Sequence, residues 1–158
     1  EDTAVMKKAL NSKNNFIDIG HAGTAMRFLT SYFSTVKDRE IILTGSKRME
    51  ERPIKILVDA LRKLGAKILY QKNEGFPPIK IIGTDLMSKD ISLSSSISSQ
   101  YISSLMLLAP IIDNGLRIKL IGKVTSEPYI KMTLELLKEL GINSFFNINS
   151  ETGFSIIS

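Results

Sequence analysis

Residues 53–65 read PIKILVDALRKLG, and residues 129–141 read YIKMTLELLKELG. The two stretches are 76 positions apart, and in both of them apolar residues recur every three or four positions before a final glycine. This spacing predicts an amphipathic helix that ends at the glycine. The same offset places Thr24 on Gln100, outside these helices. We therefore expect an internal repeat, with each unit covering about half of the chain.

Each unit is predicted to contain strand, helix, strand, helix, strand and strand, in that order. In the first copy, within 16–83, these elements are expected at 16–19, 22–34, 40–44, 53–64, 67–71 and 79–82. In the second copy, within 90–158, they are expected at 91–94, 99–109, 116–121, 128–140, 144–148 and 154–157. A further helix at 1–11 has no partner strands before it, and the chain starts without methionine. We expect a piece of a longer protein that forms a single lobe.

The predicted helices at 22–34 and 99–109 are apolar on most sides, which is typical of buried helices. The strand at 116–121 instead alternates apolar residues with Arg117 and Lys119, so one of its faces can meet water. We expect an α/β fold of the α+β type, built from repeated βαβαββ units. Its helices lie inside and its mixed sheets outside, unlike the layers of a Rossmann domain.

Composition excludes several classes of protein. The chain has 158 residues, of which 43% are hydrophobic, enough to bury a core. It has no cysteine, so disulfides and thiolate metal sites are excluded, and the single histidine, His21, argues against a histidine-rich metal centre. No apolar run is long enough to cross a bilayer, and no signal peptide is evident. We expect a cytoplasmic protein with no metal, no cofactor and no membrane partner.

The net charge of +5 raises the question of a nucleic-acid partner. Nucleic-acid binders usually gather their basic residues on one face and add aromatic residues for stacking. Here lysine and arginine are spread among 16 acidic residues, and aromatic residues make up only 7% of the chain. Modest positive charge also steers small anions, so we expect an anionic metabolite and no nucleic acid.

Two segments of the first copy carry anion-binding chemistry at predicted helix starts. Gly23 lets backbone N–H groups approach a ligand, while Thr24 adds a hydroxyl and Arg27 a cation one turn later. The alternative is an ordinary turn from strand to helix. Arg52, in a polar loop beside rigid Pro53, can offer a planar fork to a carboxylate or phosphate. The alternative there is surface ion pairing of Arg48 and Arg52 with Glu50 and Glu51.

The second copy offers hydroxyl and amide groups at its helix starts. Ser98 or Ser99 can cap the apolar helix, and Gln100 points an amide from its first turn. The alternative is that this serine-rich run is a flexible linker. Ser126 repeats the arrangement, and Tyr129 suits either a cyclic polyol or packing. We expect His21 to be a hydrogen-bonding loop residue and not a catalytic base.

Four segments, taken together and in order, resemble the signatures of the 5-enolpyruvylshikimate-3-phosphate synthases. They are GHAGTAMR at 20–27, LTG with RMEERPI within 43–54, SSQY at 98–101 and SEPYI at 126–130. The resemblance implies an enzyme of the shikimate pathway that transfers the enolpyruvyl group of phosphoenolpyruvate to the 5-hydroxyl of shikimate 3-phosphate, with release of phosphate. It also implies two lobes of βαβαββ units, of which this chain would be most of one.

The resemblance further implies a role for each site residue. Shikimate 3-phosphate would be held by Ser98, Ser99, Gln100, Ser126 and Tyr129, with the three serines around its phosphate and Tyr129 beside its ring. Gly23, Arg52 and Gln100 would meet phosphoenolpyruvate, and Thr24 and Arg27 would shape that pocket from behind. Arg52 and Gln100 would be the catalytic residues of this lobe. The family often has asparagine at the position of His21 and proline at that of Phe28.

We expect the chain to be a monomer that binds substrate without turnover, because the proton-transfer lysine and carboxylates of the family would lie in absent segments, namely the lost beginning of the chain and the second lobe. One alternative is the related UDP-N-acetylglucosamine enolpyruvyl transferase, which shares the fold. The other is a module that binds RNA termini on a similar βαβαββ framework.

Overall fold

A computed structural model describes residues 2–122, 124, 127–146 and 154–156. The chain forms two compact units, Glu1–Leu86 and Met87–Ser158. Each unit has its own four-stranded sheet and its own helices.

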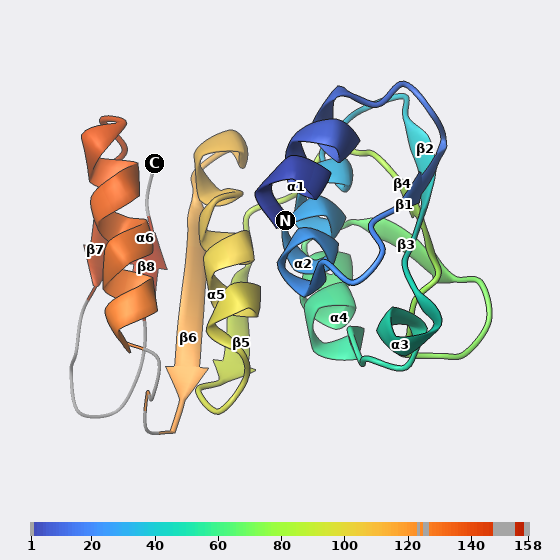
Figure 1. Cartoon of the computed structure of the whole chain (residues 1–158). Coiled ribbons are helices and arrows are strands. Elements are labelled where there is room, and N and C mark those ends of the chain that lie inside the picture. The colour runs from blue at the N-terminus through green and yellow to red at the C-terminus, as the bar shows by residue number, and fades with distance from the viewer. Residues whose placement is uncertain (1, 123, 125–126, 147–153, 157–158) are drawn as a thin grey trace. The chain divides into compact units, whose positions relative to one another are not determined.

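The first unit places its helices on one face of its sheet (Figure 1). Its sheet has the order β1-β2-β4-β3, in which β1 runs parallel to β2 and the other neighbours are antiparallel. Its elements are α1 (Asp2–Asn11), β1 (Phe16–Asp18), α2 (Gly23–Phe33), β2 (Glu40–Thr44), α3 (Lys47–Glu50), α4 (Lys55–Lys63), β3 (Lys67–Tyr70) and β4 (Ile79–Ile82).

The second unit has the same topology. Its sheet has the order β5-β6-β8-β7, again with one parallel pair at the edge, β5 and β6, and antiparallel pairs elsewhere. Its elements are β5 (Asp90–Ser94), α5 (Ser99–Met106), the short 3₁₀ helix η1 (Ala109–Ile111), β6 (Leu116–Ile121), α6 (Glu127–Glu139), β7 (Ser144–Phe146) and β8 (Phe154–Ile156).

The predicted α/β fold with βαβαββ units is confirmed, and most predicted elements agree with the structure within a few residues. The largest difference is the helix expected at 99–109, because α5 ends at Met106. Pro110 follows in η1, where it lacks an N–H for an α-helical bond and disfavours helix in the residue before it. Residues 147, 148 and 157 of the predicted strands lie outside the described residues.

The inner helices of both units are buried on most sides, as the sequence predicts. In α2, eight of the eleven residues are buried, including Leu29 and Phe33. The strands alternate, so that β6 buries Leu116, Ile118 and Leu120 and exposes the residues between them. One face of each sheet therefore packs on helices while the other is solvated.

Several buried hydroxyl groups of the helices are hydrogen-bonded within the same unit. In α2 the Thr30 hydroxyl donates to the Met26 carbonyl over 2.7 Å. In the second unit the buried hydroxyls of Ser103 and Thr133 lie 2.8 Å apart and join α5 to α6. Burial of a hydroxyl group costs free energy unless the group is hydrogen-bonded. These hydrogen bonds therefore allow the helix faces that carry Thr30, Ser103 and Thr133 to be buried.

The two glycines predicted to end helices do so in the same way. Gly65 follows α4 with a φ of 102°, and Gly141 follows α6 with a φ of 79°. After each glycine, the next N–H reaches back to a carbonyl five residues earlier, from Ala66 to Leu61 and from Ile142 to Leu137. This pattern is the Schellman motif, which favours glycine because the left-handed conformation is costly for other residues.

In the part of the chain that the structure describes, no helix combines the length and the apolar character needed to cross a membrane.

The burial of α2 predicts a large effect of shortening its core side chains. Leu29 is fully buried, so Leu29→Ala removes apolar contacts and leaves a cavity, which should lower the free energy of unfolding by about 2–5 kcal/mol. Ile56 on α4 is 45% exposed, so Ile56→Ala should cost about 1 kcal/mol or less. Urea unfolding followed by circular dichroism measures both. Equal losses would contradict the inner position of α2.

Candidate anion-binding site

The turn between β1 and α2 is fixed by hydrogen bonds before the helix starts. The Asp18 carboxylate accepts from the Gly20 N–H over 2.8 Å, and the Ile19 N–H donates to the Thr44 carbonyl over 3.0 Å. The Ala22 N–H then donates to the Ile19 carbonyl over 3.1 Å. These bonds place Gly23 as the first residue of α2, where backbone N–H groups lack partners within the helix.

Two arginines converge on Gly23 from different parts of the first unit. A Cβ atom at this position would lie 2.5 Å from Nη1 of Arg52 and 2.6 Å from Nη1 of Arg27. Arg27 is buried and donates from Nη1 to the Gly23 carbonyl over 2.6 Å, whereas Arg52 is exposed. Like charges gathered this closely around a helix start favour a bound anion. Thr24 is half-buried in the same helical turn.

The segment that carries Arg48 and Arg52 is held by a short helix, so the prediction of a loop there is wrong in part. Ser46 caps α3, and its Oγ accepts from the Met49 N–H over 3.3 Å. The Arg52 N–H donates to the Met49 carbonyl over 3.1 Å. The predicted helix start at Pro53 is also shifted, because α4 begins at Lys55.

Glu50 connects α3 to the rest of the unit. Its Oε1 accepts from the Thr44 hydroxyl over 3.2 Å, and its Oε2 accepts from Nζ of Lys72 over 2.7 Å. The hydrogen bond from Lys72, helped by that from Thr44, lowers the pKa of Glu50. Among the residues that the structure describes, no ion pair joins Arg48 or Arg52 to an acidic side chain. The alternative of surface ion pairing within this segment is therefore not what the structure shows.

A cavity of about 450 Å³ opens beside these arginines and is lined by His21, Arg48, Met49 and Arg52. We call it the arginine pocket. Its volume falls in the range of small-molecule sites, and its charged lining is basic. Sequence reasoning assigned Arg52 to the site but not Arg48. The spacing of four residues between them could have indicated a shared face.

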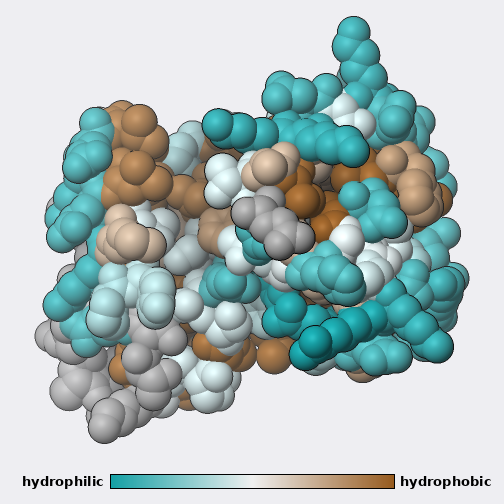
Figure 2. Space-filling model, in the orientation of Figure 1, coloured by the Kyte–Doolittle hydropathy of each residue, from teal (hydrophilic) through white to brown (hydrophobic). Residues whose placement is uncertain are grey.

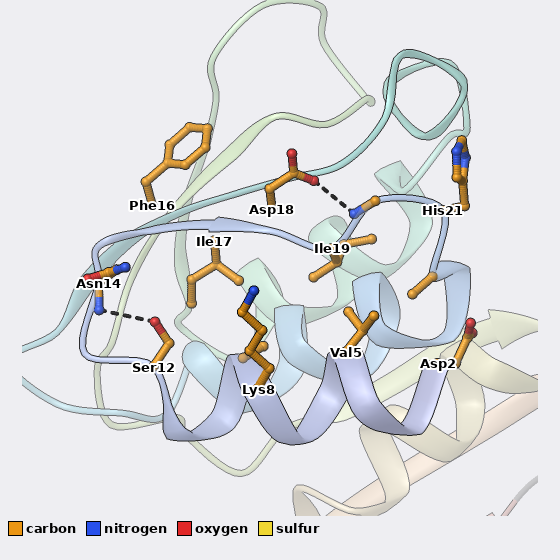
Figure 3. Close-up of a pocket in the computed structure, with 13 residues that line it drawn as sticks. Asp2, Val5, Lys8, Ser12, Asn14, Phe16, Ile17, Asp18, Ile19 and His21 are labelled. Atoms are coloured by element: carbon orange, nitrogen blue, oxygen red, sulfur yellow. Dashed lines mark hydrogen bonds between the residues drawn. The ribbon is translucent and has the colours of Figure 1, made fainter.

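A second cavity, of about 630 Å³, lies between α1 and β1 and also has His21 in its lining (Figure 3). Its polar lining mixes both signs of charge, with Asp2, Asp18 and Lys8. Apolar side chains such as Val5 and Ile17 form much of the rest, and hydrophobic residues are visible there between hydrophilic ones (Figure 2). A lining of mixed charge does not favour an anion over other ligands, and no pattern in the sequence indicated this cavity.

In the second unit, the serine-rich segment is ordered structure and not a linker. Ser94 ends β5, and its Oγ lies 2.7 Å from that of Ser96. The N–H of buried Ser95 donates to the Ile121 carbonyl over 2.9 Å. Ser98 caps α5, since its Oγ accepts from the Gln100 N–H over 3.4 Å. The linker interpretation of these residues is therefore wrong.

The remaining predicted residues stand at the starts of α5 and α6. Ser99 and Gln100 are half-buried in the first turn of α5. Tyr129, in the first turn of α6, is 60% exposed, so its side chain is not part of the core. Ser126 lies outside the described residues. The structure thus brings Gly23, Arg27 and Arg52 together in one unit, and Ser98, Ser99 and Gln100 in the other.

His21 forms the loop hydrogen bond that the sequence predicts, with Nδ1 2.8 Å from Oγ of Ser46. Among the described residues, no group of three or more histidine, aspartate or glutamate side chains is placed to hold a metal ion.

A sequence profile of the family described as EPSP synthase (3-phosphoshikimate 1-carboxyvinyltransferase) matches residues 2–154. The chain belongs to the EPSP synthase family. A relative from Bacteroides fragilis, named 3-phosphoshikimate 1-carboxyvinyltransferase, is 51% identical over 144 residues, which are 91% of this chain and 35% of that protein. A relative of the same name from Actinobacillus pleuropneumoniae serotype 3 is 43% identical over 137 residues, which are 85% of this chain and 32% of that protein.

The fold agrees with a solved EPSP synthase from Acinetobacter baumannii, with a TM-score of 0.74 at 21% identity over 92% of this chain and 31% of that chain. The chain thus spans about a third of the length of the curated relatives it matches. Membership of the EPSP synthase family does not favour either alternative, the UDP-N-acetylglucosamine enolpyruvyl transferase or the RNA-terminus module.

The contacts of Glu50 predict a pH-dependent contribution to stability. Because the folded-state pKa of Glu50 lies below its ordinary value of 4.5, its pairing with Lys72 stabilises the fold above that pH. This contribution is lost as the pH falls through the lower folded-state value. Lys72→Met should therefore lower the urea midpoint at pH 7, and the difference from wild type should shrink as the pH falls below 4.5.

The matched control is Lys67→Met, which removes an exposed lysine on β3. It should leave the pH profile of the urea midpoint parallel to that of wild type. A Lys72→Met difference that stays constant down to pH 3 would contradict the role of Glu50.

Proposed function

We propose that this chain is a substrate-binding lobe of an enzyme that makes 5-enolpyruvylshikimate 3-phosphate and phosphate from shikimate 3-phosphate and phosphoenolpyruvate. The observation that carries the proposal is the convergence of Arg27 and Arg52 on Gly23, in a chain of the EPSP synthase family. Phosphoenolpyruvate carries a phosphate and a carboxylate, and planar guanidinium groups bind both well.

The reaction needs two anions held in a fixed relation. The 5-hydroxyl oxygen of shikimate 3-phosphate forms a bond to C2 of phosphoenolpyruvate, the hydroxyl loses its proton, and the methylene carbon gains one. The resulting tetrahedral intermediate then breaks its bond to the phosphate oxygen and returns a proton from the methyl group, which restores the double bond. Enzymes accelerate such a reaction by positioning the reactants and by proton transfer. The residues of this chain contribute the positioning.

In this proposal the first unit holds phosphoenolpyruvate through Gly23 and Arg52, with Thr24 and Arg27 behind them. The second unit holds shikimate 3-phosphate through Ser98, Ser99, Ser126 and Tyr129, and Gln100 contacts both substrates. The ordered cap of α5 supports this role, because Ser98 and Gln100 occupy a helix start where N–H groups attract phosphate.

The isolated chain should bind these substrates without turning them over. The matched part of this chain spans about a third of the curated relatives. The resemblance to the family implies that the proton-transfer groups lie in segments outside this chain. Phosphate release from the two substrates should therefore be absent, and substantial turnover would contradict this part of the proposal. The cytoplasmic location and the monomeric state stay predictions from the sequence.

The assignment of substrates is tested by titrating the ¹⁵N-labelled chain with each substrate. Phosphoenolpyruvate should shift the amide signals of Gly23 and Thr24, and shikimate 3-phosphate those of Ser98, Ser99 and Gln100. Salt-dependent binding of an oligonucleotide at the same signals would instead favour the RNA-terminus module. Absence of any shift at millimolar substrate would contradict the proposal.

Loss of the Arg52 guanidinium should weaken phosphoenolpyruvate binding. A charge-assisted hydrogen bond contributes about 1.5–3 kcal/mol, so Arg52→Gln should raise the Kd by about tenfold to a hundredfold in calorimetry. Arg117→Gln removes the same charge from an exposed arginine on β6 and should change the Kd less than about twofold. If both variants raised the Kd equally, binding would be explained by nonspecific charge attraction and the role of Arg52 would be contradicted.

Gly23→Ala should separate binding from stability. Its Cβ would push the tips of both arginines from their positions, although alanine suits a helix better than glycine does. We expect phosphoenolpyruvate binding to weaken at least about tenfold while the melting temperature stays equal or rises. Unchanged affinity would show that the close approach at Gly23 plays no part in binding.

A further inference from the structure

His21 lines the arginine pocket beside Arg48 and Arg52, although nothing so far gives it a role toward a ligand. The residue belongs to the turn between β1 and α2, and its imidazole points away from α1 (Figure 3). The turn is held on both sides, because the Gly20 N–H donates to Asp18 and the Gly20 carbonyl accepts from the Ser46 N–H over 2.9 Å. The imidazole is therefore presented by a fixed backbone.

The contact with Ser46 engages one ring nitrogen of His21 and leaves the other for a ligand. Oγ of Ser46 accepts from the Met49 N–H over 3.3 Å, and it lies 2.8 Å from Nδ1 of His21. The serine hydroxyl still has its proton to donate, and in the proposed arrangement it donates that proton to Nδ1. A neutral imidazole that accepts at Nδ1 carries its own proton at Nε2, so Nε2–H is the donor left for a ligand.

We propose that His21 is a further ligand-binding residue of the arginine pocket, which donates from Nε2–H to the phosphate or carboxylate of phosphoenolpyruvate. This inference rests on the proposed function. The guanidinium groups of exposed Arg48 and Arg52 supply charge on flexible side chains, whereas the imidazole supplies one donor whose position is set before the ligand arrives. A hydrogen-bond donor that is fixed before binding orients the anion and lowers the entropy cost of binding it.

A purely structural role is the competing explanation. In that case the bond between His21 and Ser46 would only join the turn before α2 to α3, and Nε2 would meet no ligand. The two explanations differ in what happens at Nε2 when phosphoenolpyruvate is added.

The experiment uses the fact that His21 is the single histidine of the sequence. Long-range ¹H–¹⁵N spectra of the ¹⁵N-labelled chain report both ring nitrogens of this one residue without ambiguity. They should show an Nε2-protonated imidazole without ligand, and phosphoenolpyruvate should shift the Nε2 signal over the same concentrations that shift the Gly23 amide. Ser46→Ala should mix the two tautomers and weaken binding.

Substitutions of His21 provide the second readout. His21→Phe keeps a flat ring but removes both nitrogens, and it should raise the Kd for phosphoenolpyruvate by about tenfold in calorimetry. His21→Gln retains a side-chain donor and should recover part of the affinity. A circular dichroism spectrum of each variant, compared with that of wild type, tests whether the variant is folded.

The outcomes separate this inference from the proposed function. If phosphoenolpyruvate shifts the Gly23 amide but leaves the His21 ring signals unchanged, the role of His21 is overturned and the proposed function stands. If neither signal moves at millimolar phosphoenolpyruvate, both are overturned. An Nδ1-protonated imidazole in the free chain, or equal affinity of wild type and His21→Phe, would also overturn the role of His21.

Discussion

The burial of α2 is the constraint on which the first unit depends, and it also holds the guanidinium of Arg27 at the start of the helix. The helix can be enclosed because its hydroxyls bond to its own carbonyls and its apolar residues fill the space above the sheet. Arg27 is enclosed with it and donates to the carbonyl of Gly23. A charged group at the first turn is thus held by the same packing that stabilises the fold. The position of the guanidinium does not depend on a mobile surface side chain.

The internal repeat puts different chemistry at equivalent places. In both units a helix starts directly after the first strand of a parallel pair, at Gly23 in one and at Ser99 in the other. The first copy surrounds that start with guanidinium groups, and the second with a capping serine and an amide. One backbone arrangement therefore presents guanidinium groups in one copy and neutral hydroxyl and amide groups in the other, and in the proposed function these groups would meet two different phosphorylated substrates.

Most of the fold could be predicted because it follows from periodic patterns that act over short distances. The stripe of α4, the alternation of β6 and the glycines after α4 and α6 are all local signals. The helix α3 was missed because four residues are too few to show a period. The pairing of Glu50 with Lys72 was missed for another reason, since it joins residues 22 positions apart, with α4 and β3 between them.

The site could be predicted residue by residue but not as a cavity. Sequence reasoning assigned Gly23, Arg27 and Arg52 to anion binding, yet their meeting point depends on tertiary packing of α3 beside the start of α2. His21 illustrates the limit well. The sequence predicted its hydrogen bond, but the identity of the partner, Ser46, required the fold.

The guanidinium groups around Gly23 have a thermodynamic consequence for the first unit. Like charges held this close repel one another, so an anion bound between them lowers the free energy of the native state. The unfolded chain does not hold these charges together and binds the anion only weakly. Occupancy and folding are then linked by mass action, and a ligand at a hundred times its Kd adds about 2.7 kcal/mol to the unfolding free energy. The unfolding free energy of this protein therefore depends on the anion in the buffer. Its value in phosphate buffer would differ from its value in chloride solution of the same pH.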